Sequence, residues 1–171
     1  MLEPALFKVS GPPTLPEKAG GGSVRRVDPA SRPPGTFFEL SGPPPRFSDH
    51  SRYAVVPPQG ATTTDPARRN SVVAGVSDVF VRGPDIIVVD QGATLGGVPA
   101  FPEQPGAAKL DLGAVGSATV LPWLGGNELR VSRPNGHYVR LAGTVPVSEL
   151  AAVGRDLHPV EGGQLVVLDN G

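Results

Sequence analysis

Two β-hairpins are predicted by the pattern of apolar and polar residues in the second half of the chain. In the first, Ser71–Arg82 and Asp85–Gln91 are rich in Val, Ile and Phe and flank the turn residues Gly83-Pro84, which is typical of paired strands. The run Ile86-Ile87-Val88-Val89 is apolar at every position. Such a run predicts a central strand, covered on both faces.

The second predicted hairpin spans Asn127–Gly143 around the turn Arg133-Pro134-Asn135-Gly136. Proline presets the second turn position, and glycine accepts a left-handed backbone. A three-residue loop pairs Val131 with Val139, and by the same register Leu129 with Leu141. A two-residue loop would instead oppose Val131 to Arg140, so the hydrophobic pattern selects the longer loop.

That register also brings polar residues together on the other face of the hairpin. Ser132 lies opposite Tyr138, and Arg130 lies opposite Arg140, an arrangement of like charges that is unfavourable without an acidic neighbour. One interpretation gives the arginines an intramolecular partner, Glu128 or Asp156. The other makes Arg130, Tyr138 and Arg140 a binding site for a carboxylate or phosphate head group.

One helix is predicted after the second hairpin. Val147, Leu150, Ala151 and Leu157 recur on one face, Thr144 is placed to cap the N-terminus, and His158-Pro159 ends the helix. A helix of about ten residues is not stable alone. We therefore expect its apolar face to pack on the sheet.

The first 70 residues differ from the rest because they hold 13 of the 21 prolines. Proline shortens or ends strands, so we expect only short ones there, with a polar loop over residues 61–71. The shorter predicted strands of the whole chain are Leu6–Val9, Ser23–Val27, Thr36–Leu40, Tyr53–Val56, Lys109–Leu112, Ala118–Leu121 and Gln164–Leu168.

These elements predict a mainly β, or β-rich α+β, fold: a curved antiparallel sheet or half-barrel with one short C-terminal helix packed on it. The 171 residues fit a single domain. Within it, residues 1–70 form a proline-rich section of short strands and loops, and residues 71–171 form the main antiparallel sheet plus the helix.

Composition excludes several classes of function. The formal net charge is −1, which argues against a nucleic-acid-binding surface. The absence of cysteine excludes disulfides and thiolate sites. No window is apolar enough for a membrane helix, and residues 1–7 do not resemble a signal peptide. Any membrane link would then need a segment outside this chain, and a cytoplasmic location stays open.

Catalytic and metal-binding motifs are not apparent, so we expect no enzyme, no cofactor and no metal. His50 is expected in a polar loop, His137 on an exposed strand and His158 at the end of the helix. Asp78, Asp85 and Asp90 surround the first hairpin but lack the spacing of a calcium loop. The single tryptophan, Trp123, is expected either to plug the core or to form the wall of an apolar ligand site.

The last third of the chain has a recognisable order of residues. Leu124-Gly125-Gly126 leads into the hairpin, and Gly143-Thr144 precedes a helix that contains Glu149-Leu150-Ala151. Over residues 120–158 this resembles bacterial extracytoplasmic domains related to lipoprotein carriers and to periplasmic regulators of the MucB/RseB type. The resemblance implies a half-barrel with a helix at its concave side, which holds acyl chains or lipid-modified peptides, or senses the envelope. It implies no catalytic residues.

Three hypotheses of function follow. The first is a non-enzymatic extracytoplasmic binding or sensory domain for a lipid-like ligand or an envelope protein, with Trp123 and the helix face of Val147 and Leu150 lining a cavity. The second is a protein-interaction module with a filled core and a flat apolar patch. The third is a hydrolase, which needs a histidine in a cleft beside serine and aspartate.

Overall fold

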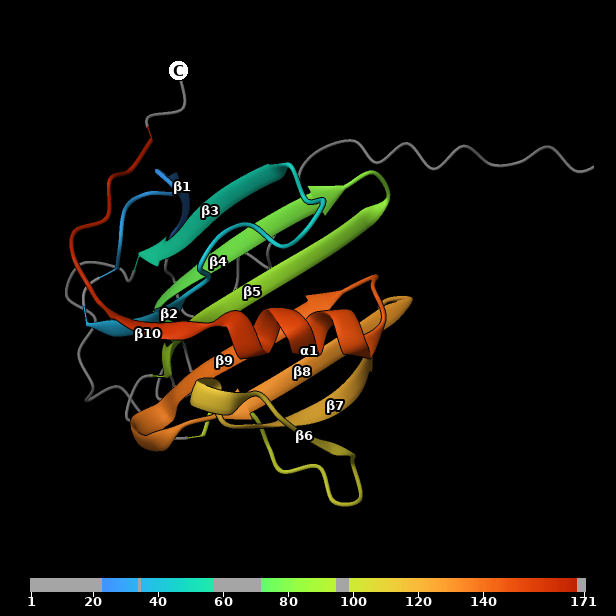
Figure 1. Ribbon diagram of the computed structural model, residues 1–171. Helices are drawn as coiled ribbons and strands as arrows, with labels where there is room; N and C mark the ends of the chain where they lie inside the picture. The colour runs from blue at the N-terminus through green and yellow to red at the C-terminus, as the bar shows by residue number, and fades with distance from the viewer. Residues whose placement is uncertain (1–22, 34, 57–71, 95–98, 169–171) are drawn as a thin grey trace, which may run out of the picture.

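An antiparallel sheet of eight strands forms the centre of the molecule (Figure 1). The computed structural model describes residues 23–33, 35–56, 72–94 and 99–168. The spatial order of the strands is β1-β3-β4-β5-β9-β8-β7-β6, and the sheet does not close. Their bounds are β1 Ser23–Val27, β3 Asp49–Val56, β4 Val72–Arg82, β5 Asp85–Thr94, β6 Lys109–Asp111, β7 Ser117–Trp123, β8 Gly126–Ser132 and β9 His137–Gly143. The predicted mainly β fold with one short helix is confirmed.

Both predicted hairpins are present, and the second has the predicted register. In β4–β5, Arg82 pairs with Asp85 across the turn. In β8–β9, Leu129 pairs with Leu141 and Val131 with Val139, as the longer loop requires. The turn residues Asn135 and Gly136 have φ angles of 59° and 71°, a left-handed conformation that asparagine and glycine tolerate best.

Helix α1 (Val147–Asp156) follows β9 and lies across β8 and β9 (Figure 1). Its Leu150 side chain is fully buried, as the apolar spacing predicts. The predicted cap was wrong. Pro146 occupies the N-cap position, and the Thr144 hydroxyl instead accepts a hydrogen bond from the Ile86 N–H at 3.0 Å.

The two faces of the sheet differ. We call the face against which α1 packs the covered face, and the opposite face, against which no described helix packs, the helix-free face. On the covered face, β8 and β9 contact α1, which also contacts the short 3-10 helix η3 (Gly113–Val115). This side holds the core, which is built mainly of aliphatic residues with three phenylalanines. Its largest fully buried members are Ile87, Leu112, Leu129, Leu141, Leu150, Val89, Val115, Val139 and Val145.

Residues 28–33 and 35–47 cover the part of the same face that α1 does not reach. Within them, β2 (Thr36–Glu39) pairs with β10 (His158–Glu161) in a separate two-stranded sheet. Phe38 and Phe47 of this segment belong to the main core. Sequence reasoning missed β10, because four residues that include a proline are a weak strand signal.

The main sheet extends further toward the N-terminus than expected. The division at residue 71 was wrong in this respect, because β1 and β3 belong to the same sheet as β4. The strand expected over Gln164–Leu168 is reduced to one bridge, between Val167 and Val27. The predicted strand Leu6–Val9 and the predicted loop 61–71 lie outside the described residues. Among the described helices, none has both the length and the apolarity to cross a membrane.

Candidate functional site

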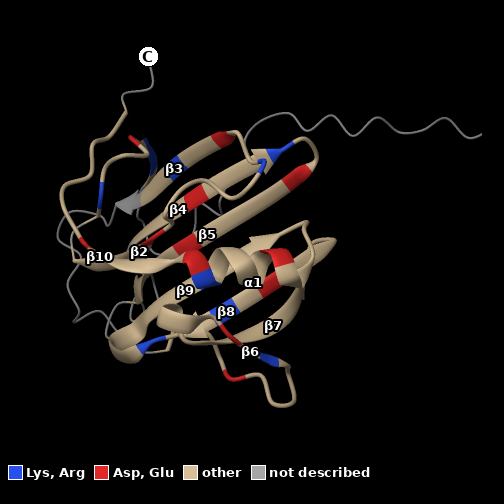
Figure 2. Cartoon of the chain, in the orientation of Figure 1, with Lys and Arg blue, Asp and Glu red and all other residues tan. Residues whose placement is uncertain are grey.

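A row of polar side chains crosses the helix-free face at right angles to the strands. The strand register places these residues next to one another on six neighbouring strands, in the spatial order β3, β4, β5, β9, β8 and β7. They are Tyr53, Ser77, Asp90, Arg140, Arg130 and Thr119. Arg26 on β1 and Lys109 on β6 extend the row at its two ends. Charges of both signs are interspersed along the strands (Figure 2).

The centre of this row is a cluster of two arginines and two carboxylates. Arg130 and Arg140 lie opposite each other, as the register predicts. Both bind the Glu128 carboxylate: Arg130 Nε and Arg140 Nε lie 2.7 and 2.5 Å from Glu128 Oε1, and Arg130 Nη2 lies 3.1 Å from Oε2. Arg140 Nη1 also donates to Asp90, which accepts a further bond from the Ser77 hydroxyl.

Of the two intramolecular partners predicted for the arginines, Glu128 is the one used. Asp156 lies on α1, where its carboxylate accepts a bond from the Ser41 N–H at 3.1 Å. Glu128 and Arg130 are two positions apart on one strand, and their side chains therefore share a face. That spacing was the signal for the contact.

The two carboxylates of the cluster are more deeply buried than the two guanidinium groups. The Glu128 side chain is 2% exposed and that of Asp90 is 14% exposed, whereas those of Arg140 and Arg130 are 24% and 29% exposed. Burial by itself raises the pKa of the Glu128 carboxyl, but the bonds and charges of the two arginines outweigh burial, so its pKa lies below its ordinary value. An approaching molecule therefore meets the guanidinium groups before the carboxylates.

Aromatic rings flank the two arginines. The Arg130 guanidinium carbon lies 5.2 Å from the ring centre of Phe101, which also contacts Tyr138 edge-on with 5.4 Å between ring centres. The Arg140 guanidinium carbon lies 5.8 Å from the centre of the Trp123 ring. These distances are in the range of cation–π contacts. Burial, with a contribution from Asp90, raises the pKa of Tyr138 to about 12.

Four of the six predicted binding residues thus gather on the helix-free face: Trp123, Arg130, Tyr138 and Arg140. Val147 and Leu150 lie on the opposite side of the sheet, where Leu150 is fully buried and Val147 packs against the core. The predicted cavity lined jointly by Trp123 and the helix was therefore wrong. Trp123 neither plugs the core nor faces α1. Phe101 was missed, because it lies in a segment that has only loop character in the sequence.

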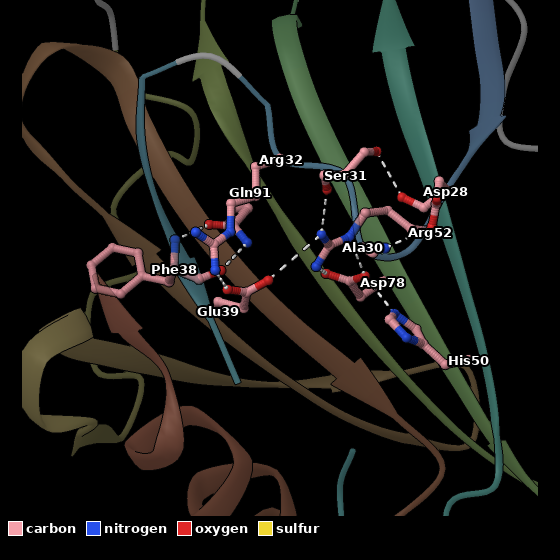
Figure 3. A network of polar contacts seen from close by, with 10 residues as sticks. All are labelled: Asp28, Ala30, Ser31, Arg32, Phe38, Glu39, His50, Arg52, Asp78 and Gln91. Atoms are coloured by element: carbon pink, nitrogen blue, oxygen red, sulfur yellow. Dashed lines mark hydrogen bonds and ion pairs between the residues drawn. The ribbon is translucent and has the colours of Figure 1, made fainter. Parts of the chain in front are cut away.

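A second polar cluster lies on the covered face, beneath residues 28–33 and 35–40 (Figure 3). Arg52 binds both oxygens of Asp78, with Nε–Oδ1 and Nη2–Oδ2 distances of 2.7 and 3.0 Å. His50 Nε2 lies 2.7 Å from the same Oδ1, and its ring stacks on Phe80 with 4.5 Å between centres. The expectation that His50 lies in a polar loop was wrong, since it belongs to β3.

The covered-face cluster and Gln91 hold the backbone of Ser31 and Phe38 against the sheet. Arg52 Nη1 donates to the Ser31 carbonyl at 2.8 Å. The Gln91 side chain accepts from the Phe38 N–H and donates to the Phe38 carbonyl, each at 2.7 Å (Figure 3). Burial raises the pKa of the Asp78 carboxyl, but bonds from His50 and Arg52 outweigh it and hold that pKa below its ordinary value. These contacts account for the buried charges structurally.

Among the described residues, none completes a hydrolase triad with His50 and Asp78. A small cavity of about 160 Å³ is lined by His50, Arg52, Asp78 and Glu39, together with apolar residues. Among the described contacts, His50 meets a carboxylate but no serine hydroxyl. The nearby Ser31 hydroxyl donates to the Asp28 carbonyl. As expected, His137 is exposed on β9 and His158 is exposed just after α1.

The three aspartates of the first hairpin each bind an arginine rather than converge on a cation. Asp78 binds Arg52, Asp85 binds Arg82 at 2.9 Å, and Asp90 binds Arg140. Within the described ranges, no group of three or more metal-ligating side chains is close enough to hold a metal ion.

An open groove of about 670 Å³ lies between α1 and residues 40–46. Leu40, Ala152, Val153 and the prolines of Pro43-Pro44-Pro45 give it apolar walls. At its rim, Arg82 Nη1 lies 2.9 Å from Glu149 Oε1. The groove is separate from the arginine cluster, because α1 lies on the opposite side of the sheet.

Comparison of the chain with protein-family models, with curated proteins and with solved structures found no match.

Proposed function

We propose that this chain is a non-enzymatic binding domain, and that its helix-free face binds an acidic segment of a partner protein. The single observation that carries the proposal is the pair Arg130 and Arg140, fixed by Glu128 and flanked by Trp123, Phe101 and Tyr138. Arginine, tryptophan and tyrosine are the residues that dominate protein interfaces.

The greater exposure of the guanidinium groups, compared with the carboxylates, supports an acidic partner. The carboxylates beneath the arginines hold the guanidinium groups in place, so less side-chain freedom is lost when a ligand binds. The guanidinium groups are the more exposed members of the cluster. A carboxylate that approaches them gains charge-assisted hydrogen bonds.

The filled interior favours a protein partner over a lipid held inside the fold. Leu112, Leu129, Leu141 and Leu150 are all fully buried between sheet and helix. A carrier for an acyl chain needs a cavity there. The placement of the domain outside the cytoplasm, as an envelope regulator or carrier, rests on the resemblance of residues 120–158 alone.

Trp123 makes this proposal testable without an identified partner, because it is the only tryptophan and lies beside Arg140. Its emission is recorded while hexaglutamate or hexalysine is added at low salt. We expect hexaglutamate to change the emission saturably, an effect weakened by salt, and hexalysine to leave it unchanged. Equal responses to both peptides, or none to hexaglutamate, would overturn the proposal.

The variant for this experiment removes all four charges together: Arg130→Gln, Arg140→Gln, Glu128→Gln and Asp90→Asn. No buried carboxylate is then left unpaired. We expect the affinity for hexaglutamate to fall by about tenfold or more. Arg25→Gln is the matched control, because Arg25 pairs with Ala54 on the covered face of the same sheet. An equal loss in this control would show a general charge effect instead.

A lipid-like ligand is a second candidate because of the groove beside α1. Its apolar walls and volume of about 670 Å³ suit one acyl chain. The exposed Ala152 lies on its wall, so Ala152→Trp fills the groove from outside the core. We expect dodecyl phosphate to bind the unaltered chain and to bind this variant at least tenfold more weakly. Unchanged affinity would exclude the groove as its site.

A further inference from the structure

The outer edge of the main sheet carries a short extended segment with an exposed apolar surface. Residues 166–168 run antiparallel to β1, with Leu168 N–H donating to the Arg26 carbonyl at 3.0 Å and Asp28 N–H donating to the Val166 carbonyl at 2.8 Å. Val166, Val167 and Leu168 are 53%, 39% and 38% exposed. They are among the few large apolar residues that the described part of the chain exposes.

The hydrogen-bond pattern shows which backbone groups of this segment are open. Val167 lies opposite Val27, and the two bonds to β1 come from the residues on either side of it. In an antiparallel ladder, the N–H and C=O of such a residue point away from the strand it faces. No described residue forms a backbone hydrogen bond with Val167 on that outer side.

Residues 162–168 lack the sequence features that usually protect a sheet edge. Proteins block open edges with charged residues, prolines or bulges. Residues 162–168, Gly-Gly-Gln-Leu-Val-Val-Leu, contain no charged residue and no proline. An open, uncharged edge can add another strand.

We propose that two copies of this chain pair through this edge, about a twofold axis at Val167. In that register Val167 exchanges both backbone hydrogen bonds with the partner subunit's Val167. The same register sets Val166 across from the partner subunit's Leu168, and the reverse. Each of the three exposed side chains then gains an apolar neighbour, as an isologous interface requires.

The charge pattern favours a second copy over a foreign peptide. About this twofold axis only Val167 faces its own copy, and a charge at that position would face a like charge. The neutral edge avoids this repulsion and offers no charge to attract an acidic or basic peptide. The inference is independent of the proposed function, since the arginine cluster lies on the face of the sheet and not at this edge.

Engineered cysteines test the pairing, because the chain has none of its own. Val167→Cys places the two thiols across the axis, within the reach of a disulfide. Under mild oxidation we expect this variant to form covalent dimers at least tenfold faster than Leu124→Cys. Leu124 is the matched control because it is 85% exposed at the tip of the β7–β8 turn. Equal or faster cross-linking of the control would overturn the proposal.

Sedimentation of the unaltered chain gives a second readout. A contact of this size forms weak, reversible assemblies, so we expect the average mass to rise from 17.6 kDa toward twice that value with concentration. Val167→Lys should hold the mass at the monomer value, and Leu124→Lys should leave the rise intact. Circular dichroism establishes that both variants are folded. A mass independent of concentration in the unaltered chain would also refute the pairing.

Discussion

Arg52 and Asp78 lie directly opposite each other on β3 and β4, and the guanidinium group binds both oxygens of the carboxylate. Both residues are nearly inaccessible to solvent, at 3% and 5% exposed. A buried ion pair contributes little net stability when complete, but loss of one partner leaves an uncompensated charge.

Asp78→Ala should therefore lower the free energy of unfolding by about 3–5 kcal/mol. Urea denaturation followed by circular dichroism measures the change. Asp49→Ala is the control, since Asp49 is exposed on the same β3 strand and exposed substitutions usually stay within about 0.5 kcal/mol. A loss below about 1 kcal/mol for Asp78→Ala would show that Arg52 finds another partner.

Gln91→Leu should loosen β2 from the sheet. The substitution removes the two side-chain bonds to the backbone of Phe38 and leaves a buried N–H and C=O without partners, at a cost of about 2 kcal/mol or more. Hydrogen exchange of the Phe38 amide, followed by NMR, should become at least tenfold faster. Gln164→Leu, at an exposed position, should leave that rate unchanged.

Acid should destabilise the domain through Glu128. Its pKa in the folded chain lies below the ordinary value of 4.5, so the unfolded chain binds more protons as the pH falls. The stabilisation is present above about pH 4.5 and is lost as the pH falls through the lower, folded pKa. The free energy of unfolding should decline less steeply below pH 4.5 in Glu128→Gln than in the unaltered chain. Parallel declines would mean that the arginines do not bind the carboxylate in solution.

Tyr138 should ionise late in the folded chain. Its pKa is raised to about 12, and the absorbance of the phenolate at 295 nm reports its ionisation. The difference between the titration of the unaltered chain and that of Tyr138→Phe isolates this residue from Tyr53, the only other tyrosine. A midpoint near 10 would place the Tyr138 hydroxyl in water.

Gly154→Ala should destabilise the protein although alanine favours helices by about 1 kcal/mol. An added Cβ would lie 2.9 Å from Leu112 Cδ1 and 3.1 Å from Cδ2, and Leu112 is fully buried. We expect a net loss of about 1–2 kcal/mol from overpacking. In a Leu112→Ala background the same substitution should become neutral or stabilising, and an unchanged cost there would locate the strain elsewhere.

The hairpin register was predictable because side chains alternate with a period of two. Once Leu129 and Val131 were assigned to one face, the pairing of Arg130 with Arg140 followed. The same rule could have placed Trp123. Had the strand expected at Ala118–Leu121 been extended by two residues, Trp123 would have fallen on the face opposite the buried Ala118.

Contacts between distant elements could not be predicted in this way. Arg52 and Asp78 are 26 residues apart in the sequence. Each has apolar neighbours, and this local pattern fits an exposed position on a strand as well as a buried ion pair. The link between Gln91 and Phe38 spans 53 residues and joins two layers, for which no local pattern exists. The hydrophobic pattern determines how neighbouring strands pair and leaves open which segments cover the sheet.

The pairing of β2 with β10 has a consequence for synthesis on the ribosome. Within the described residues, β2 has no other strand partner, and its partner residues 158–161 are translated more than a hundred residues after it. Phe37 and Phe38 of β2, and the ion pair of Arg52 with Asp78, therefore stay uncovered while more than a hundred further residues are made. Such late closure slows folding and leaves this apolar surface open to aggregation until β10 has been made.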